Sequence, residues 1–136
     1  AVATVDAAGK VTVKGPGVAK ITVKAAATTD YKAASKTVTV TVAPKKQSIS
    51  LINKIKKQLT IKWKKNTKAS GYQVVYSTNK KFTGKKTVRK AKTTTSYKIK
   101  GLKKGKKYYV KVRSYKTVNG KRIYGAYSTA KKATIK

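Results

Sequence analysis

Apolar residues recur at every second position along most of this chain of 136 residues. The clearest runs are Leu59–Lys64, Tyr72–Tyr76 and Tyr108–Arg113, where apolar side chains alternate with mostly charged or polar ones. A period of two places alternate side chains on opposite faces of a β-strand, whereas an amphipathic helix needs a period near 3.6. Because no convincing helical period occurs, the sequence predicts an all-β chain.

Turn signals separate the predicted strands at short intervals. Asp6-Ala7-Ala8-Gly9 has Asp first and Gly fourth, as a type I turn prefers, and it would join Ala3–Val5 to Lys10–Lys14. Asn119-Gly120 is a strong signal for a two-residue hairpin. Gly15-Pro16-Gly17 breaks the chain before a further strand.

The best candidate for a linker is Ala43-Pro44-Lys45-Lys46. It divides the chain into a segment 1–43 and a domain 47–136, with 44–46 between them. The second part has the size and turn spacing of a seven-strand antiparallel β-sandwich, with Trp63 as its largest buried anchor. Its predicted strands are Ser48–Leu51, Gln58–Lys64, Gly71–Ser77, Thr87–Lys90, Ser96–Ile99, Tyr108–Tyr115 and Gly125–Ile135.

The second part carries Trp63 on its second strand, Gly71-Tyr72 at the start of the third, a Leu102–Tyr108 corner and Val110-x-Val112 after it. With these residues, Gln47–Lys136 as a whole resembles a bacterial fibronectin type III domain. The family's corner is Leu-x-Pro-Gly-Thr-x-Tyr, so Lys104 and Lys106 stand where Pro and Thr are usual. Both are predicted loop positions. The resemblance therefore implies a β-sandwich that usually serves as a spacer or an adhesive appendage.

Residues 1–43 are similar to the later strands of a bacterial Ig-like domain of group 2. The similar stretches are Val2–Asp6, Gly9–Val13, Gly17–Val23 and Thr37–Val42. Such domains are usually about twice as long, so this resemblance implies that the first strands are missing. Four strands could form a small sheet with an open edge or an uncovered face. We expect this segment to pack on the second domain, to associate with another copy, or to be the less stable region.

Composition argues against catalysis. Only Asp6 and Asp30 are acidic, and His, Cys and Glu are absent. These are the side chains that enzymes use most for acid–base and nucleophilic chemistry and for binding zinc or calcium. The sequence therefore predicts a protein that is not an enzyme and needs no cofactor or metal. No stretch approaches the length of a membrane-spanning helix.

Thirty-six basic residues give the chain a formal charge of +34. All are Lys except Arg89, Arg113 and Arg122, and Lys suits solubility and loose, salt-sensitive association better than it suits base recognition. One interpretation is a solvated shell that discourages aggregation. The other is adhesion to anionic cell-wall polymers such as teichoic acids, or to host glycans. The candidate partner-binding residues are Asn119, Gly120, Lys121 and Arg122, together with Lys103, Lys104, Lys106 and Lys107. The first four lie at the Asn119-Gly120 turn, which is the position of the family's F–G hairpin, the connection between its last two strands.

Tyr is the principal aromatic residue, with nine copies. Four fit inward positions: Tyr72, Tyr76, Tyr97 and Tyr108. Another four lie near the last hairpin, where some should be exposed beside cations: Tyr109, Tyr115, Tyr124 and Tyr127. Such rings can stack on sugars or bases, but packing across strands on a sheet surface is the more common arrangement.

The sequence as a whole predicts a secreted or cell-surface binding module, of the kind found in surface proteins of gut Gram-positive bacteria. A second hypothesis is a released polypeptide that binds a host protein receptor, as the animal myokine irisin does with the same fold. A third is nucleic-acid binding, which the scarcity of Arg disfavours.

Overall fold

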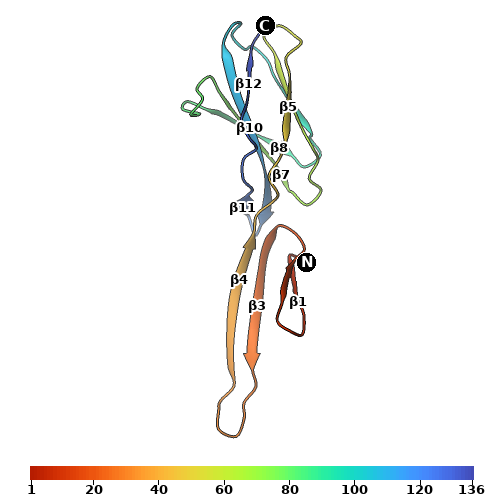
Figure 1. The fold of residues 1–136 in the computed structure, drawn as a ribbon, viewed down its shortest axis with the longest axis vertical. Helices are drawn as coiled ribbons and strands as arrows, with labels where there is room; N and C mark the ends of the chain where they lie inside the picture. Colours follow the sequence, from red (N-terminus) through yellow and green to blue (C-terminus); the bar gives the residue numbers. More distant parts are fainter.

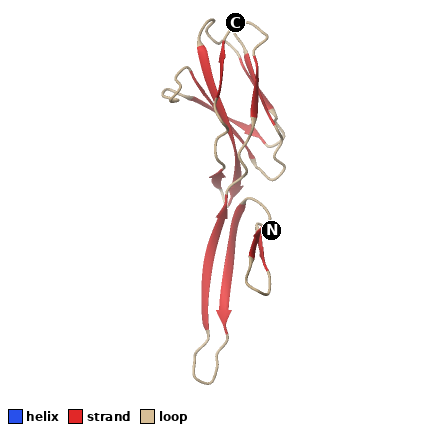
Figure 2. Cartoon of the chain, in the orientation of Figure 1, coloured by secondary structure: helices blue, strands red, loops and turns tan.

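A computed structural model describes all residues from Ala1 to Lys136 and contains strands but no helices (Figure 2). No helix is therefore available that could cross a membrane. The first four strands lie before the expected linker: β1 (Ala3–Val5), β2 (Val11–Val13), β3 (Gly17–Ala25) and β4 (Ala34–Val42). Eight follow it: β5 (Ile49–Ile52), β6 (Leu59–Trp63), β7 (Gly71–Ser77), β8 (Lys86–Ala91), β9 (Ser96–Ile99), β10 (Lys107–Val118), β11 (Lys121–Tyr124) and β12 (Lys131–Thr134).

The eight later strands form two antiparallel sheets that face each other. One sheet has the order β5-β6-β9. The other has the order β11-β10-β7-β8, and β12 also pairs with β10. Because β7 occupies one edge of β10, β11 and β12 share the other edge, one at each end of this long strand. This is the predicted β-sandwich, and it forms the upper half of the molecule in Figure 1.

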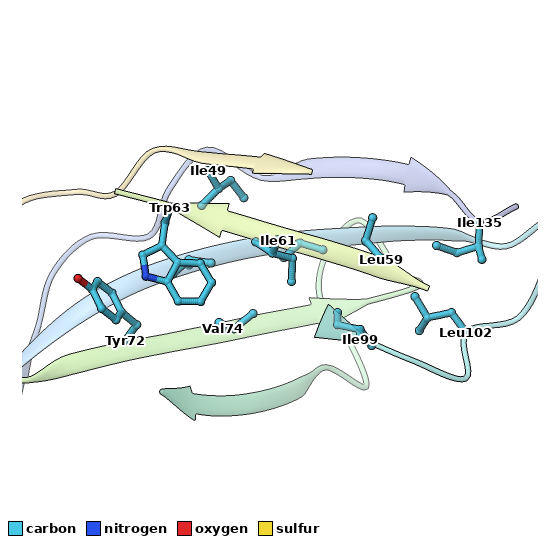
Figure 3. Packing of buried hydrophobic residues seen from close by; sticks show 11 residues of the cluster. Ile49, Leu59, Ile61, Trp63, Tyr72, Val74, Ile99, Leu102 and Ile135 are labelled. Atoms are coloured by element: carbon cyan, nitrogen blue, oxygen red, sulfur yellow. The ribbon is translucent and has the colours of Figure 1, made fainter. Parts of the chain in front are cut away.

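The core lies between the two sheets and is drawn in Figure 3. Its eleven buried residues are Ile49, Leu59, Ile61, Trp63, Tyr72, Val74, Ile99, Leu102, Val110, Val112 and Ile135. The alternation of the sequence accounts for them, since Leu59, Ile61 and Trp63 occupy every second position of β6 and point to one face. Trp63 packs against Tyr72 with ring centroids 5.3 Å apart, as its predicted role as the core anchor requires.

The other inward-facing tyrosines are partly buried. Tyr76, Tyr97 and Tyr108 pack against the edge of the core cluster, while Tyr72 is fully buried within it. Burial raises the pKa of the Tyr76 phenol above its ordinary value of 10.0, and the nearby Tyr97 and Tyr108 raise it further. The predicted inward orientation of all four is confirmed.

Most predicted strands match the structure, but the last one does not. The prediction of one strand over 125–135 is wrong, because regular pairing with β10 stops after β11 and resumes only at β12. Ser128 provides the physical reason. Its hydroxyl accepts a hydrogen bond from the backbone N–H of Val112 at 3.0 Å, and its own N–H donates to the carbonyl of Val112 at 2.7 Å. A side-chain oxygen thus replaces a ladder acceptor, and no regular pairing is needed there.

Residues 1–43 do not form the expected four-stranded sheet. Instead β1 pairs only with β2, and β3 pairs only with β4. The amides of Lys14 and Gly15 both donate to the carbonyl of Val2, which turns the chain back on the first hairpin before β3 begins. The predicted turn at Asp6 is confirmed, because its carboxylate accepts from the amides of Ala8 and Lys10.

The long β3–β4 ribbon extends away from the sandwich and gives the molecule its elongated shape (Figure 1). Its register places Ala19 beside Val40 and Ile21 beside Val38, so one face is mostly apolar, although Lys36 beside Val23 interrupts it. Part of this face is not covered, since Val23 is 63% and Val38 47% exposed, whereas Ala19, Ile21 and Val40 are half-buried. The start of β3 meets the end of β10, where Gly17 lies near Val118, so the expected packing on the second part is found at this end of the ribbon.

Candidate functional site

The predicted F–G hairpin forms as expected. Asn119 (φ 48°) and Gly120 (φ 75°) are both in the left-handed region, which a type I′ turn between β10 and β11 requires. Arg122 lies with its guanidinium 5.6 Å from the ring centroid of Tyr115, while Lys121 is exposed. The hairpin therefore presents one free cation and one cation engaged with an aromatic ring.

The second candidate set occupies the turn before β10. Lys103, Lys104, Lys106 and Lys107 are all exposed. The turn is held by a hydrogen bond from the amide of Gly105 to the carbonyl of Ile135 at 2.9 Å. These four lysines lie at the opposite end of β10 from Asn119–Arg122, and a strand of this length spans about 36 Å. The structure therefore places the predicted site residues in two separate places.

A basic hollow that the sequence did not reveal lies at the end of the sandwich nearest the ribbon. We call it the Asn66 groove; it has a volume of about 370 Å³ and no hydrophobic residue in its lining. The linker and the β6–β7 loop supply most of its surface: Lys45, Lys46, Lys64, Lys65, Asn66 and Lys68. The pairs Lys45-Lys46 and Lys64-Lys65 are visible in the sequence, but only the tertiary structure brings them together.

Hydrogen bonds hold the loop that forms the floor of the Asn66 groove. The amide of Asn66 donates to the hydroxyl of Tyr72 at 2.6 Å, and the Asn66 side-chain oxygen accepts from the amide of Lys68 at 3.1 Å. The Lys68 ammonium donates to the carbonyl of Lys14 at 2.6 Å, so the same loop also holds the N-terminal segment. Since Tyr72 is fully buried, this loop is fixed to the core.

Two smaller hollows adjoin the groove and share Asn66. One has a volume of about 280 Å³ and lies between the loop and the N-terminal segment, where Lys14 and Pro16 line it. The other, of about 180 Å³, is lined by Lys92 and Thr93 from the β8–β9 turn. Four separate stretches of chain thus bring lysines to one end of the sandwich. No acidic residue follows Asp30, so no carboxylate from the sandwich can offset their charge.

A ladder of alternating rings and cations covers the outer face of the larger sheet. The Lys111 ammonium lies 4.1 Å from the ring centroid of Phe82 and 4.5 Å from that of Tyr127. The Arg113 guanidinium lies 3.8 Å from the centroid of Tyr124 and 4.3 Å from that of Tyr127. Each cation is thus placed between two rings, in contacts that are worth about 0.5–2 kcal/mol each.

The buried side-chain amide of Gln73 holds this ladder of rings and cations in place through hydrogen bonds. The side-chain oxygen of Gln73 accepts from Nε of Arg113 at 2.7 Å and from the hydroxyl of Tyr127 at 3.1 Å, and Gln73 is only 7% exposed. Tyr109, Tyr115, Tyr124 and Tyr127 are all half-buried rather than exposed. The predicted packing is confirmed for Tyr115, Tyr124 and Tyr127, whereas the expectation that some of the four rings are exposed is wrong. Arg113 and Tyr127 have a structural role.

The chemistry of these surfaces is that of binding. No cluster of three or more His, Cys, Asp or Glu occurs that could hold a metal ion. The groove offers ammonium groups, an amide and hydroxyls, which donate hydrogen bonds to anions. An arrangement of this kind can attract and hold negatively charged groups.

Comparison with a family profile matches residues 42–130 to the Fibronectin type III domain. This match covers the sandwich except β12 and leaves most of residues 1–43 outside, so it gives the Ig-like resemblance of that segment no support. One known protein, a Kelch domain-containing protein of the archaeon Sulfurisphaera tokodaii, is 36% identical over 85 residues. That alignment covers 62% of this chain but only 11% of the other protein. Because this relative is archaeal, a bacterial source stays a prediction.

Solved structures with the same fold include several fibronectin type III domains. The FN1-FN3 domains of chicken CNTN1 match 93% of this chain and 47% of that one, with a TM-score of 0.60 and 18% identity. The fn3 domain of human contactin 1 matches 69% of this chain and 80% of its own, with a TM-score of 0.59 and 16% identity. A myokine structure matches 68% of this chain and 98% of its own, with a TM-score of 0.54 and 15% identity.

At these identities the structural likeness shows the fold alone. Domains of this type are typically non-enzymatic binding modules and typically occur in extracellular proteins. The sandwich topology, the Trp63 core and the profile match agree, and the chain belongs to the fibronectin type III family.

Proposed function

We propose that this chain is a secreted or cell-surface adhesion module that binds anionic polymers through its lysine-rich surface. One observation carries the proposal. The basic residues of the sandwich point outward from a rigid core, and no acidic residue after Asp30 offsets them. The fibronectin type III fold supports a binding role in place of a catalytic one.

The mechanism is multivalent electrostatic attachment. A rigid sandwich displays ammonium groups without losing backbone freedom on binding. Each exposed ammonium contributes little by itself, but a polyanion engages many of them and releases its condensed counterions. The suitable ligands are anionic cell-wall polymers such as teichoic acids, or sulfated and sialylated host glycans.

Binding across a salt series tests the proposal. We expect the purified chain to bind immobilised teichoic acid or a sulfated glycan, with an affinity that falls steeply as salt rises. Neutral dextran serves as the control polymer and should not bind. Failure to bind any of the anionic polymers at physiological salt would contradict the proposal.

A second candidate function is that of a soluble ligand for a host protein receptor, in the manner of irisin. The observation that favours it is the match to a myokine structure, which extends over 98% of that chain and 68% of this one. This function predicts saturable binding to host cells at physiological salt. Substitution of Asn119–Arg122 should abolish this binding to host cells. Removal of the same amount of positive charge from Lys103–Lys107 should leave the binding unchanged.

Residues 1–43 have a proposed role of their own. We infer that residues 1–43 are part of an Ig-like unit of a bacterial surface protein. The open edges of β3 and β4 and the partly uncovered apolar face between them support this inference, because such a face is normally buried against further strands. A second copy of the chain could cover the same face, which would make the module self-associate.

A further inference from the structure

We propose that the Asn66 groove is a specific binding site for phosphate or sulfate groups repeated along a polymer chain. This inference rests on the proposed function and deepens it, because it replaces diffuse attraction by the whole surface with one defined site. It also locates that site away from the F–G hairpin and from the Lys103–Lys107 turn, where the sequence placed it.

Convergence of charge is the first argument. Five lysines line this one hollow: Lys45, Lys46, Lys64, Lys65 and Lys68. Because all five line one hollow of about 370 Å³, their fields add there. The two sets predicted from the sequence lie at opposite ends of β10, and their fields do not combine over about 36 Å. A concave surface with one sign of charge also focuses the field.

Preorganisation is the second argument. The β6–β7 loop is anchored to the core by the bond from Asn66 to Tyr72 and is closed by a bond from the amide of Ala69 to the carbonyl of Asn66 at 3.1 Å. Pro44 of the linker is buried, and the hydroxyl of Ser114 donates to the carbonyl of Lys45 at 3.2 Å. Both walls of the groove are therefore held before any ligand arrives, which lowers the entropic cost of binding.

The lining chemistry selects the ligand class. The side-chain oxygen of Asn66 accepts a hydrogen bond from the backbone amide of Lys68. The side-chain NH₂ group of Asn66 is therefore left as a donor beside the ammonium groups. Thr67 and Ser48 add hydroxyls to the lining. Tetrahedral oxyanions accept hydrogen bonds from all of these groups. Lysine binds them as a point charge and does not require the planar geometry that Arg recognises.

Nucleic acid fits the groove less well, although it also carries phosphate. No aromatic ring lines the groove, so bases have no stacking platform there. Arg, which reads guanine edges, is also absent from its lining. Arg113 instead stacks on the rings of Tyr124 and Tyr127 on the outer face of the larger sheet.

Two triple variants with the same loss of charge test the site. The groove variant K46Q/K64Q/K65Q removes three exposed lysines of the lining and leaves Lys68 in its structural bond to Lys14. The matched control K103Q/K104Q/K106Q removes three exposed lysines at the other end of the sandwich. Because all six side chains are exposed, both variants should keep the wild-type unfolding midpoint, which is measured first.

Binding to dextran sulfate and to polyphosphate is then measured across a salt series. We expect the groove variant to lose affinity about tenfold or more and to show a smaller salt slope, while the control loses less than about threefold. If the groove variant loses affinity for only one of the two polymers, the result supports the site and identifies whether it binds sulfate or phosphate.

Three results would overturn the inference. Equal losses in both variants would show that the charge acts diffusely, and they would leave the proposed function intact. If the wild-type chain bound neither dextran sulfate nor polyphosphate, the proposed function would be contradicted as well. Tighter binding of a single-stranded oligothymidylate than of either polymer, lost in the groove variant, would assign the groove to nucleic acid.

Discussion

The hydroxyl of Tyr72 accepts a hydrogen bond from the backbone amide of Asn66 at 2.6 Å, while its ring packs against Trp63. Tyr72 is fully buried, so a core residue directly positions the loop that carries Lys64, Lys65 and Lys68. The stability of the sandwich and the shape of its basic groove therefore depend on the same side chain.

Replacement of Tyr72 by Phe should destabilise the protein by about 1–2 kcal/mol. The ring keeps its packing, but the amide of Asn66 loses its acceptor. Urea denaturation of the wild type and the variant measures the difference. Tyr31→Phe is the control, because Tyr31 is 77% exposed and its loss of a hydroxyl should leave stability unchanged. Equal stability of Tyr72→Phe and wild type would show that this hydrogen bond contributes nothing.

Arg113→Lys should also destabilise the protein, by about 1 kcal/mol, although it preserves the charge. Lysine cannot stack a planar group on Tyr124 and Tyr127, and it cannot reproduce the bond from Nε to Gln73. The exposed Arg89 on β8 provides the matched control, since Arg89→Lys should change stability by less than about 0.5 kcal/mol. Thermal unfolding of the two variants at the same salt concentration makes the comparison; equal midpoints would contradict a structural role for the ladder.

Gly125→Ala should destabilise the sandwich by about 1–3 kcal/mol. An added Cβ would collide with the carbonyl oxygen of Pro44, so the linker or the end of β11 must shift. Gly15→Ala is the control, because its Cβ would meet Cδ of Lys68 at 3.5 Å and the carbonyl oxygen of Ala1 at 4.0 Å, which are ordinary contact distances. Chemical denaturation compares the two substitutions, and a neutral Gly125→Ala would mean that the linker is not fixed at this position.

Deprotonation of Tyr76 should lower the free energy of unfolding at alkaline pH. Its pKa is raised in the folded state by burial and by Tyr97 and Tyr108, so the folded protein holds the phenolic proton more tightly than the unfolded chain does. This contribution is fully present below the ordinary value of 10.0 and is lost as pH rises through the folded-state pKa. The free energy of unfolding of wild type should therefore fall relative to that of Tyr76→Phe as pH rises above about 10. A difference that stays constant with pH would contradict the raised pKa.

Amides of the β3–β4 ribbon should exchange with solvent much faster than those of β7 and β10 in dilute solution. A two-stranded ribbon is at best marginally stable alone, and the apolar face bearing Val23 and Val38 is exposed. Hydrogen-exchange mass spectrometry at several protein concentrations measures the difference. Protection that rises with concentration would show that a second copy covers this face. Full protection of residues 1–42 in a monomer would contradict both the marginal stability and the self-association.

The sequence predicted most of the sandwich because its strands are amphipathic in a local way. Leu59, Ile61 and Trp63 alternate with polar residues whatever the rest of the chain does, and Asn119-Gly120 specifies its turn by backbone preference alone. The strand break between β11 and β12 was missed. It depends on a bond between Ser128 and Val112, which are sixteen positions apart, and no local pattern encodes it.

The candidate site was less predictable than the fold. Runs of lysine such as Lys103-Lys104 are visible in the sequence, but the field at any point depends on which runs the fold brings close together. Lys45 and Lys65 lie on different segments. Both line the Asn66 groove because the linker and the β6–β7 loop reach the same end of the sandwich.

The sequence by itself determined the all-β character, the turns and the absence of the usual catalytic side chains, because these follow from local periodicity and from composition. Only the tertiary structure decided where the positive charge is concentrated and which tyrosines are engaged by cations. Both depend on distances between residues far apart in the chain, and electrostatic and packing energies vary steeply with those distances.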